Sequence, residues 1–132
     1  MENTKQLGIW MDHSNAYLME LTNGVIVTNI IKSEFAQQDN GYYMRYHEKS
    51  YHNKEQQQQS VYYKKLRDSI RNYQEVVLFG PTDAKTELLN QLKGDHLFEK
   101  IKIEVKPSDQ MTESQRQTFI IKYFKSTLDN TE

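Results

Sequence analysis

The stretch that decides the fold is EVVLFGPTDAKTELLNQL, residues 75–92. Its first five residues form a short apolar run that ends at Gly80, as expected of a buried and parallel strand. From Pro81 or Thr82 the leucines recur at helical spacing as far as about Leu92, which predicts a helix directly after the turn. A strand, a tight turn and a helix in this order predict an α/β domain, in which helices pack on a mixed sheet.

The residues before this stretch predict an antiparallel meander of three strands, over 5–12, 15–21 and 25–31. Polar residues between the first two strands favour a turn, because Asn and Ser can satisfy their own backbone locally. Asn23-Gly24 is the strongest hairpin signal in the chain, since both central residues of that turn need positive φ. The third strand is rich in β-branched residues, which suits a sheet.

The rest of the chain adds a helix over about 57–73, a strand over 101–105 and a last helix from Thr112 to about 128. Thr112 and Gln115 form a capping box at the start of that last helix. The predicted order is therefore β-β-β-α-β-α-β-α, in one domain over 1–132 with a sheet of about five strands and two or three layers. A long loop is predicted at about 33–58.

Composition narrows the classes of function. The chain has 132 residues, no cysteine and a formal net charge of −1. The lack of cysteine excludes disulfides, thiolate zinc sites and thiol nucleophiles. No signal peptide or apolar run of about 18 residues is present, so we expect a soluble, cytoplasmic protein without a membrane partner. No cofactor and no small-molecule substrate is expected, and the net charge leaves room for a local basic face.

The first candidate site is a segment that mixes basic residues with tyrosines. Residues 42–68 contain six Lys or Arg against three acidic residues. Cations neutralise phosphates and tyrosine rings stack on unpaired bases, so this mixture suits RNA. The candidate RNA-binding residues are Arg45, Tyr46, His47, Lys49, Tyr51, His52, Lys54, Lys64 and Lys65. The alternative is a solvated loop whose tyrosines fold back on the core.

The second candidate site is the turn that precedes the helix at 82–92. A helix N-terminus presents free N–H groups and a partial positive charge, so Gly80, Thr82 and Lys85 could hold an anion. The spacing is not that of a phosphate-binding P-loop, which needs a second glycine directly before the lysine. The alternative is an ordinary turn in which Thr82 or Asp83 caps the helix.

Two further groups of residues are better explained by a structural role than by catalysis or metal binding. Asp12 and His13 could do acid–base chemistry, but no nucleophile accompanies them, so a role in stabilising the turn is the better interpretation. A nuclease would need several carboxylates around metal ions, and only Asp68 and Asp83 are available as companions of Asp12. No metal site is expected, because the spacing of the histidines in residues 42–58 matches no familiar ligand pattern.

Three motifs together resemble a known family. GIWMDHSNAYLMEL, residues 8–21, resembles the strand-turn-strand that opens the central domain of archaeo-eukaryotic release factors and of Pelota, and Asp12 and Ala16 match its DxxxA pattern. VVLFGPTDAKTELLNQL, residues 76–92, resembles the strand and helix of that domain, with its Gly-Pro and lysine at Gly80, Pro81 and Lys85.

The third motif is MTESQRQTFIIKYF, residues 111–124. It is similar to the closing helix of small bacterial relatives, described as translational machinery proteins, which carry a TxxQ…YF pattern. The matching residues are Thr112, Gln115, Tyr123 and Phe124.

The resemblance implies an RNase H-like fold and a place in the ribosomal A site. Release factors carry a Gly-Gly-Gln loop between the third strand and the first helix, and this loop promotes peptidyl-tRNA hydrolysis. The corresponding residues 33–59 contain Gly41 as their one glycine and no such tripeptide. The resemblance therefore implies a non-catalytic ribosome- or RNA-associated factor of the bacterial cytoplasm. The alternative is a protein-interaction module on the same fold with no RNA role.

Overall fold

The computed structural model describes the backbone of residues 5–33 and 48–130, and the side chains of residues 5–33 and 57–125. The strands form one five-stranded sheet in the order β3-β2-β1-β4-β5. Their bounds are β1 Gln6–Met11, β2 Asn15–Thr22, β3 Val25–Lys32, β4 Glu75–Gly80 and β5 Lys102–Pro107. β1, β2 and β3 pair antiparallel, whereas β4 is parallel to both β1 and β5. The predicted mixed sheet and the predicted parallel strand at 75–79 are confirmed.

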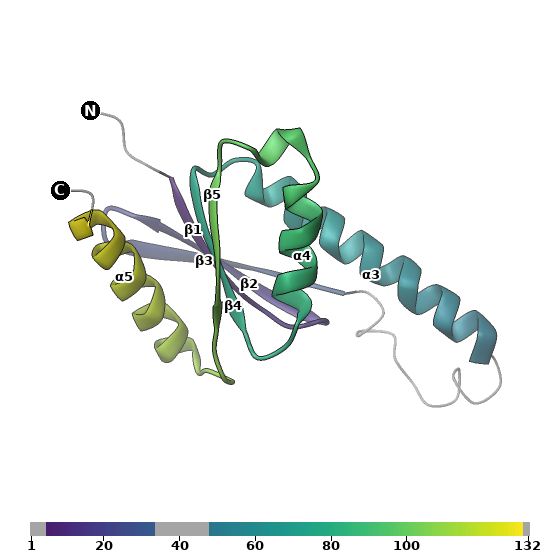
Figure 1. Cartoon of the computed structure of the whole chain (residues 1–132). Coiled ribbons are helices and arrows are strands. Elements are labelled where there is room, and N and C mark those ends of the chain that lie inside the picture. Colours follow the sequence, from purple (N-terminus) through teal and green to yellow (C-terminus); the bar gives the residue numbers. More distant parts are fainter. Residues whose placement is uncertain (1–4, 34–47, 131–132) are drawn as a thin grey trace.

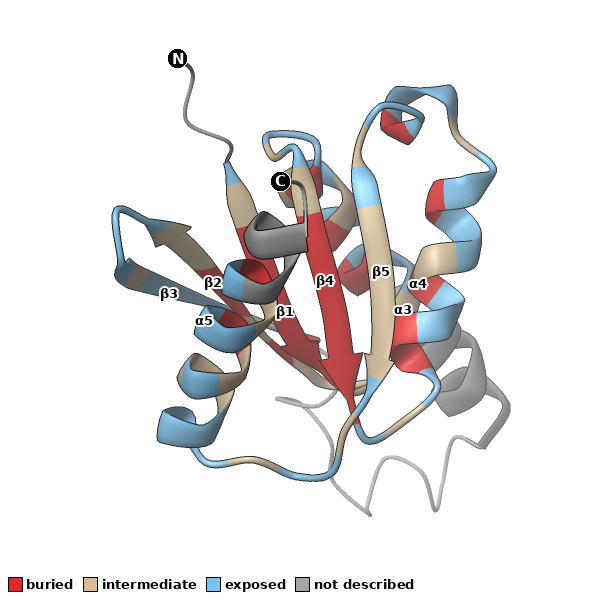
Figure 2. Ribbon diagram, turned by 60° about the vertical axis from the view of Figure 1, so that its left-hand side comes forward, coloured by how far each residue is buried: buried red, intermediate tan, exposed pale blue. Residues whose placement is uncertain are grey.

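The helices cover both faces of this sheet, so the domain has three layers (Figures 1 and 2). They are α3 Glu48–Ile70, α4 Ala84–Lys93 and α5 Glu113–Asn130, and a short 3₁₀ turn, η1, spans His96–Phe98. α3 and α4 lie on one face and α5 lies on the other. The predicted order β-β-β-α-β-α-β-α is confirmed.

Each face of the sheet has its own core. On the α3–α4 face, Ile9 and Leu78 pack with Leu66 and Leu88, and all four are fully buried. On the α5 face, Trp10, Met19, Val77, Phe79, Ile120 and Phe124 form a second cluster. Alternate residues of β4 therefore enter opposite cores, which explains why its sequence is apolar without alternation.

Local signals of the sequence fix the ends of several elements. Asn23 and Gly24 have φ of 53° and 81°, so the turn between β2 and β3 has the predicted positive dihedrals. The predicted capping box is also present: Gln115 N donates to Thr112 Oγ1 at 3.2 Å, and Thr112 N donates to Gln115 Oε1 at 2.9 Å. At the end of β4, Gly80 has φ of 149°, and a Cβ there would overlap the carbonyl oxygen of Met11.

One predicted boundary is wrong. α3 begins at Glu48 and ends at Ile70, whereas the prediction placed it over about 57–73, so residues 48–58 of the predicted loop at 33–58 belong to the helix. The first turns of α3 project beyond the sheet (Figure 1). The sequence of residues 48–56 carries no apolar stripe, so the periodic signal of the helix begins only near Val61.

Candidate functional site

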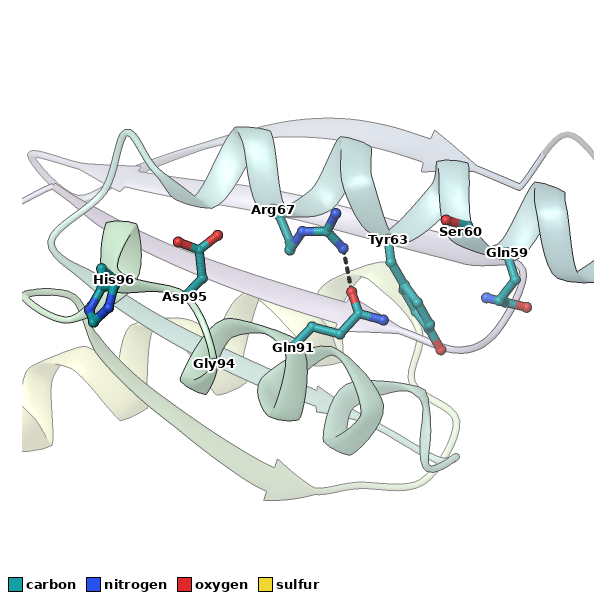
Figure 3. A pocket seen from close by; sticks show the side chains of 8 residues that line it. All are labelled: Gln59, Ser60, Tyr63, Arg67, Gln91, Gly94, Asp95 and His96. Atoms are coloured by element: carbon teal, nitrogen blue, oxygen red, sulfur yellow. Dashed lines mark hydrogen bonds between the residues drawn. The ribbon is translucent and has the colours of Figure 1, made fainter.

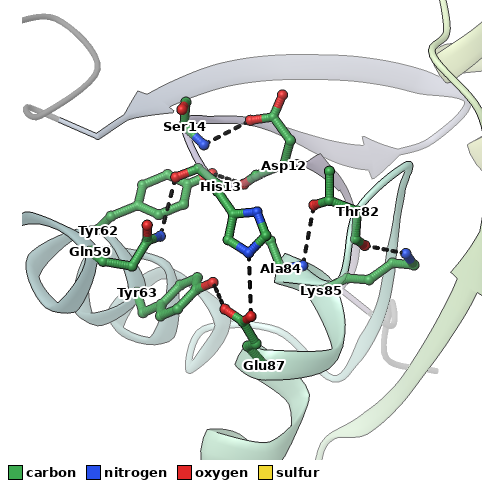
Figure 4. A network of polar contacts seen from close by, with 10 residues as sticks. All are labelled: Asp12, His13, Ser14, Gln59, Tyr62, Tyr63, Thr82, Ala84, Lys85 and Glu87. Carbon is green, nitrogen blue, oxygen red and sulfur yellow. Dashed lines mark hydrogen bonds and ion pairs between the residues drawn. The ribbon is translucent and has the colours of Figure 1, made fainter. Parts of the chain in front are cut away.

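The candidate site lies at the end of the sheet where the parallel strands β1 and β4 finish. The turn between β1 and β2, the turn between β4 and α4, and the middle of α3 meet there (Figure 4). In open α/β sheets, ligands bind outside the carboxyl ends of the strands, so this end of the sheet is the natural place for a site.

Asp12 builds the turn after β1. Its Oδ1 accepts hydrogen bonds from the backbone N–H groups of Ser14 at 2.8 Å and Asn15 at 2.7 Å. This is the side-chain-to-backbone pattern of an Asx turn, so the predicted structural role of Asp12 is confirmed. Ser33 N donates to Ser14 O at 2.8 Å, which ties the end of β3 to the same turn.

Two adjacent tyrosines of α3 hold this turn against the helices. Tyr62 donates its hydroxyl hydrogen bond to the carbonyl oxygen of Asp12 at 2.9 Å. Tyr63 donates to Glu87 Oε1 of α4, and Glu87 Oε2 lies 3.3 Å from Nε2 of His13. Burial raises the pKa of both tyrosine hydroxyls, so both remain neutral donors.

Glu87 joins three elements through these contacts. The hydrogen bond from Tyr63 lowers the pKa of its carboxyl, and the contact with His13 adds to this effect. Gln59 Nε2 of α3 donates to the carbonyl oxygen of His13 at 3.1 Å, so both ends of His13 are held. This network could not be predicted from the sequence, because its members are 24 to 74 positions apart along the chain.

The start of α4 is capped by Thr82. Thr82 Oγ1 accepts from Ala84 N at 3.2 Å, whereas Asp83 makes no side-chain cap. Lys85 is 8% exposed, and its Nζ donates to the carbonyl oxygen of Thr82 (Figure 4). The lysine therefore closes its own turn, and an anion at this helix start would have to draw Nζ away from Thr82. An anion-binding role for Gly80, Thr82 and Lys85 stays a prediction.

A shallow groove of about 750 Å³ runs between α3 and α4 (Figure 3). Tyr63 and Arg67 line it from α3, and Gln91, Asp95 and His96 line it from α4 and the segment that follows. Arg67 donates to Gln91 Oε1 across the groove. Most of the residues that line the groove carry polar side chains.

The predicted RNA-binding residues fall into two groups. Arg45, Tyr46 and His47 lie outside the described residues, as do the side chains of Lys49, Tyr51, His52 and Lys54 in the first turns of α3. Lys64 and Lys65 are exposed on α3, and Lys64 Nζ lies 3.2 Å from Asp68 Oδ2. β3 ends beside Ser14, at the same end of the sheet as the start of α4.

The described residues give little support to a nuclease site. Within residues 5–33 and 57–125, no three His, Cys, Asp or Glu side chains come together as metal ligands. Asp12 is engaged in its turn, and Asp68 lies on the exposed face of α3. In the described part of the chain, no helix has the length and apolar character needed to cross a membrane.

Comparison with known proteins identifies the fold. No protein-family model and no curated protein sequence matches the chain. The Pelota protein of Thermoplasma acidophilum is similar over 89% of this chain and 32% of its own, with 15% identity and a TM-score of 0.60. Pelota of Archaeoglobus fulgidus is similar over 95% of this chain and 32% of its own, with 9% identity and a TM-score of 0.58.

An archaeal translation termination factor is also similar, over 96% of this chain and 41% of its own, with 14% identity and a TM-score of 0.50. The chain thus spans between a third and two fifths of the length of these proteins. At such low identity the likeness shows the fold, and it confirms the fold that the sequence motifs predicted.

Proposed function

We propose that this chain is a non-catalytic factor that associates with the ribosome or with RNA in the bacterial cytoplasm. The observation that carries the proposal is the match of nearly the whole chain to a portion of Pelota and of a translation termination factor. The five glycines of the chain stand at 8, 24, 41, 80 and 94, so a Gly-Gly-Gln tripeptide is absent. Without it the chain acts by occupying a site rather than by hydrolysis.

The distribution of charge along the chain supports a contact with RNA. Lys64 and Lys65 lie on the exposed face of α3, while Tyr62 and Tyr63 of the same helix are buried against the core. The basic residues of the segment that leads into α3, Arg45, Lys49 and Lys54, belong to the same stretch of chain. Cationic side chains of this kind bind the phosphate backbone and release its counterions.

The test is sedimentation of tagged protein from bacterial lysate through a sucrose gradient, at low and at high salt. We expect the wild type to co-migrate with ribosomal particles at about 50 mM salt and to leave them at about 500 mM, because each phosphate contact weakens as salt rises. The triple charge reversal R45E/K49E/K54E should abolish co-migration, and K64E/K65E should weaken it.

The matched control is K122E/K125E. It makes the same change of charge as K64E/K65E, but on α5, where both lysines are exposed on the opposite face of the sheet. This variant should sediment like the wild type. If all three variants lost binding equally, binding would depend on the net charge of the protein and not on the basic residues in and before α3. A wild type that stays at the top of the gradient at both salt concentrations would favour the protein-interaction module instead.

A further inference from the structure

The outer edge of β3 is an exposed and apolar strand edge. β3 is the last strand of the sheet, and β2 is its one partner among the described strands. Val25, Val27 and Ile30 are 62%, 56% and 55% exposed. The pairing with β2 runs without a bulge from Thr22↔Val25 to Asn15↔Lys32, so the strand is regular over its whole length.

The opposite edge of the sheet shows the protection that β3 lacks. β5 carries Lys102, Glu104 and Lys106 on alternate positions and ends at Pro107. Charges and proline of this kind prevent an edge strand from pairing with another chain. β3 has no proline, and its one charged residue, Lys32, stands at its very end. The two edges of one sheet are thus built differently.

We propose that β3 pairs with β3 of a second copy of this chain, antiparallel and about a two-fold axis at Thr28. In the sequence VIVTNII, residues 25–31, two of the three pairs of positions related by Thr28 are apolar on both sides, and in the third pair Val27 stands against Asn29. In this register Ile26 lies opposite Ile30 of the second copy, and Val25 lies opposite Ile31. The two five-stranded sheets would then form one continuous sheet. This inference does not depend on the proposed function.

The register also satisfies the electrostatic and steric demands of such a pair. Thr28 faces its own copy, and cross-strand Thr–Thr and branched aliphatic pairs are favourable in sheets. Lys32 falls opposite Gly24 of the second copy, so no like charges face each other. The contact is a single pair of eight-residue strands, each about 26 Å long, whereas specific complexes usually bury more than about 1,000 Å². We therefore expect a weak dimer.

The first test is sedimentation equilibrium of the full chain between about 10 and 300 µM, a range that a weak complex should span. The wild type should pass from monomer to dimer over this range. V27K and I30K place a charge on the edge and should remain monomeric throughout. L97K is the matched control, because Leu97 is 59% exposed but lies in η1, far from β3 in the chain, and it should dimerise like the wild type. A wild type that remains monomeric at every concentration would overturn the proposal.

The second test fixes the register and does not depend on the lysine variants being folded. The chain has no cysteine, so single cysteines introduced on β3 report the pairing directly. Facing residues of antiparallel strands have Cα atoms about 4.5 or 5.5 Å apart, which is within the range that a disulfide spans. T28C should form a disulfide-linked dimer under mild oxidation, whereas V25C should not, because Val25 would lie about 20 Å from its own copy. Equal cross-linking of both variants would contradict the register.

Discussion

Glu87 is the residue on which the contacts of the candidate site converge. It accepts a hydrogen bond from Tyr63 and contacts His13, and the first of these contacts is the main reason that the pKa of its carboxyl is lowered. A carboxyl whose pKa is lower in the folded state stabilises the fold above its unfolded pKa. That stability is lost as the pH falls through the folded pKa.

Tyr63→Phe tests this residue-scale argument. It removes the donor to Glu87, and we expect it to lower the free energy of unfolding by about 1 kcal/mol at neutral pH, since Glu87 is half exposed and its hydrogen bonds are screened. The deficit relative to the wild type should shrink as the pH falls below about 4.5, because the wild type then also loses the contact with the carboxylate. Urea unfolding of the wild type and of Y63F at several pH values measures this deficit.

Tyr62→Phe is the matched control for that series. Its hydroxyl donates to the backbone carbonyl of Asp12, which does not titrate. The deficit of Y62F should therefore stay constant between about pH 7 and pH 3.5. If the deficits of Y62F and Y63F changed in parallel, the pH dependence would not arise from the Tyr63–Glu87 contact.

How much of this site could be predicted from the sequence depends on how far apart along the chain the contacting residues lie. The turn at Asp12 was predictable, because an Asx turn needs only the next three residues. The contact of Glu87 with Tyr63 and His13 was not, because it depends on how α3 and α4 pack on the sheet. Local propensity contains no information on such packing.

At the scale of elements, the start of α5 depends on its capping box. Thr112→Ala removes the hydroxyl that accepts from Gln115 N, and we expect a loss of about 1 kcal/mol, or about 4 °C in Tm for a domain of this size. Thr118→Ala is the matched control, since Thr118 is an exposed residue inside α5 and alanine has the higher helix propensity. Thermal unfolding should show T118A equal to or above the wild type. A T112A variant as stable as T118A would mean that the cap contributes nothing.

The helices and strands differ in how well they can be predicted from their sequences. The start of α5 and the turn of the β2–β3 hairpin were predicted because the capping box and the Asn-Gly turn are made by neighbouring residues. The start of α3 was missed because hydrophobic periodicity reports a helix only where its sequence carries an apolar stripe. The absence of glycine and proline from residues 42–79 was the signal that could have extended it.

At the scale of the whole molecule, α5 forms the third layer and packs closely against the sheet at Gly8. A Cβ added at Gly8 would lie 2.5 Å from both Cδ1 and Cγ1 of Ile120, which is fully buried in α5. The closeness of α5 to β1 therefore depends on the missing side chain. This contact spans 112 positions of the chain, and the sequence predicted the two elements but not their closest point.

A double-mutant cycle tests this dependence. Gly8→Ala should destabilise the fold by about 1–3 kcal/mol through overpacking, and Ile120→Ala by about 2–5 kcal/mol through loss of buried volume. In G8A/I120A the added methyl group enters the space that the isoleucine leaves, so the double variant should be about 1–2 kcal/mol more stable than the sum of the single effects. G8A/L66A is the control, because Leu66 packs on the opposite face of the sheet, and its effects should add. Urea unfolding of the wild type and the five variants G8A, I120A, L66A, G8A/I120A and G8A/L66A tests this dependence. Additivity in G8A/I120A would mean that α5 can shift to accept the methyl group, and that the spacing of the layers is not set at Gly8.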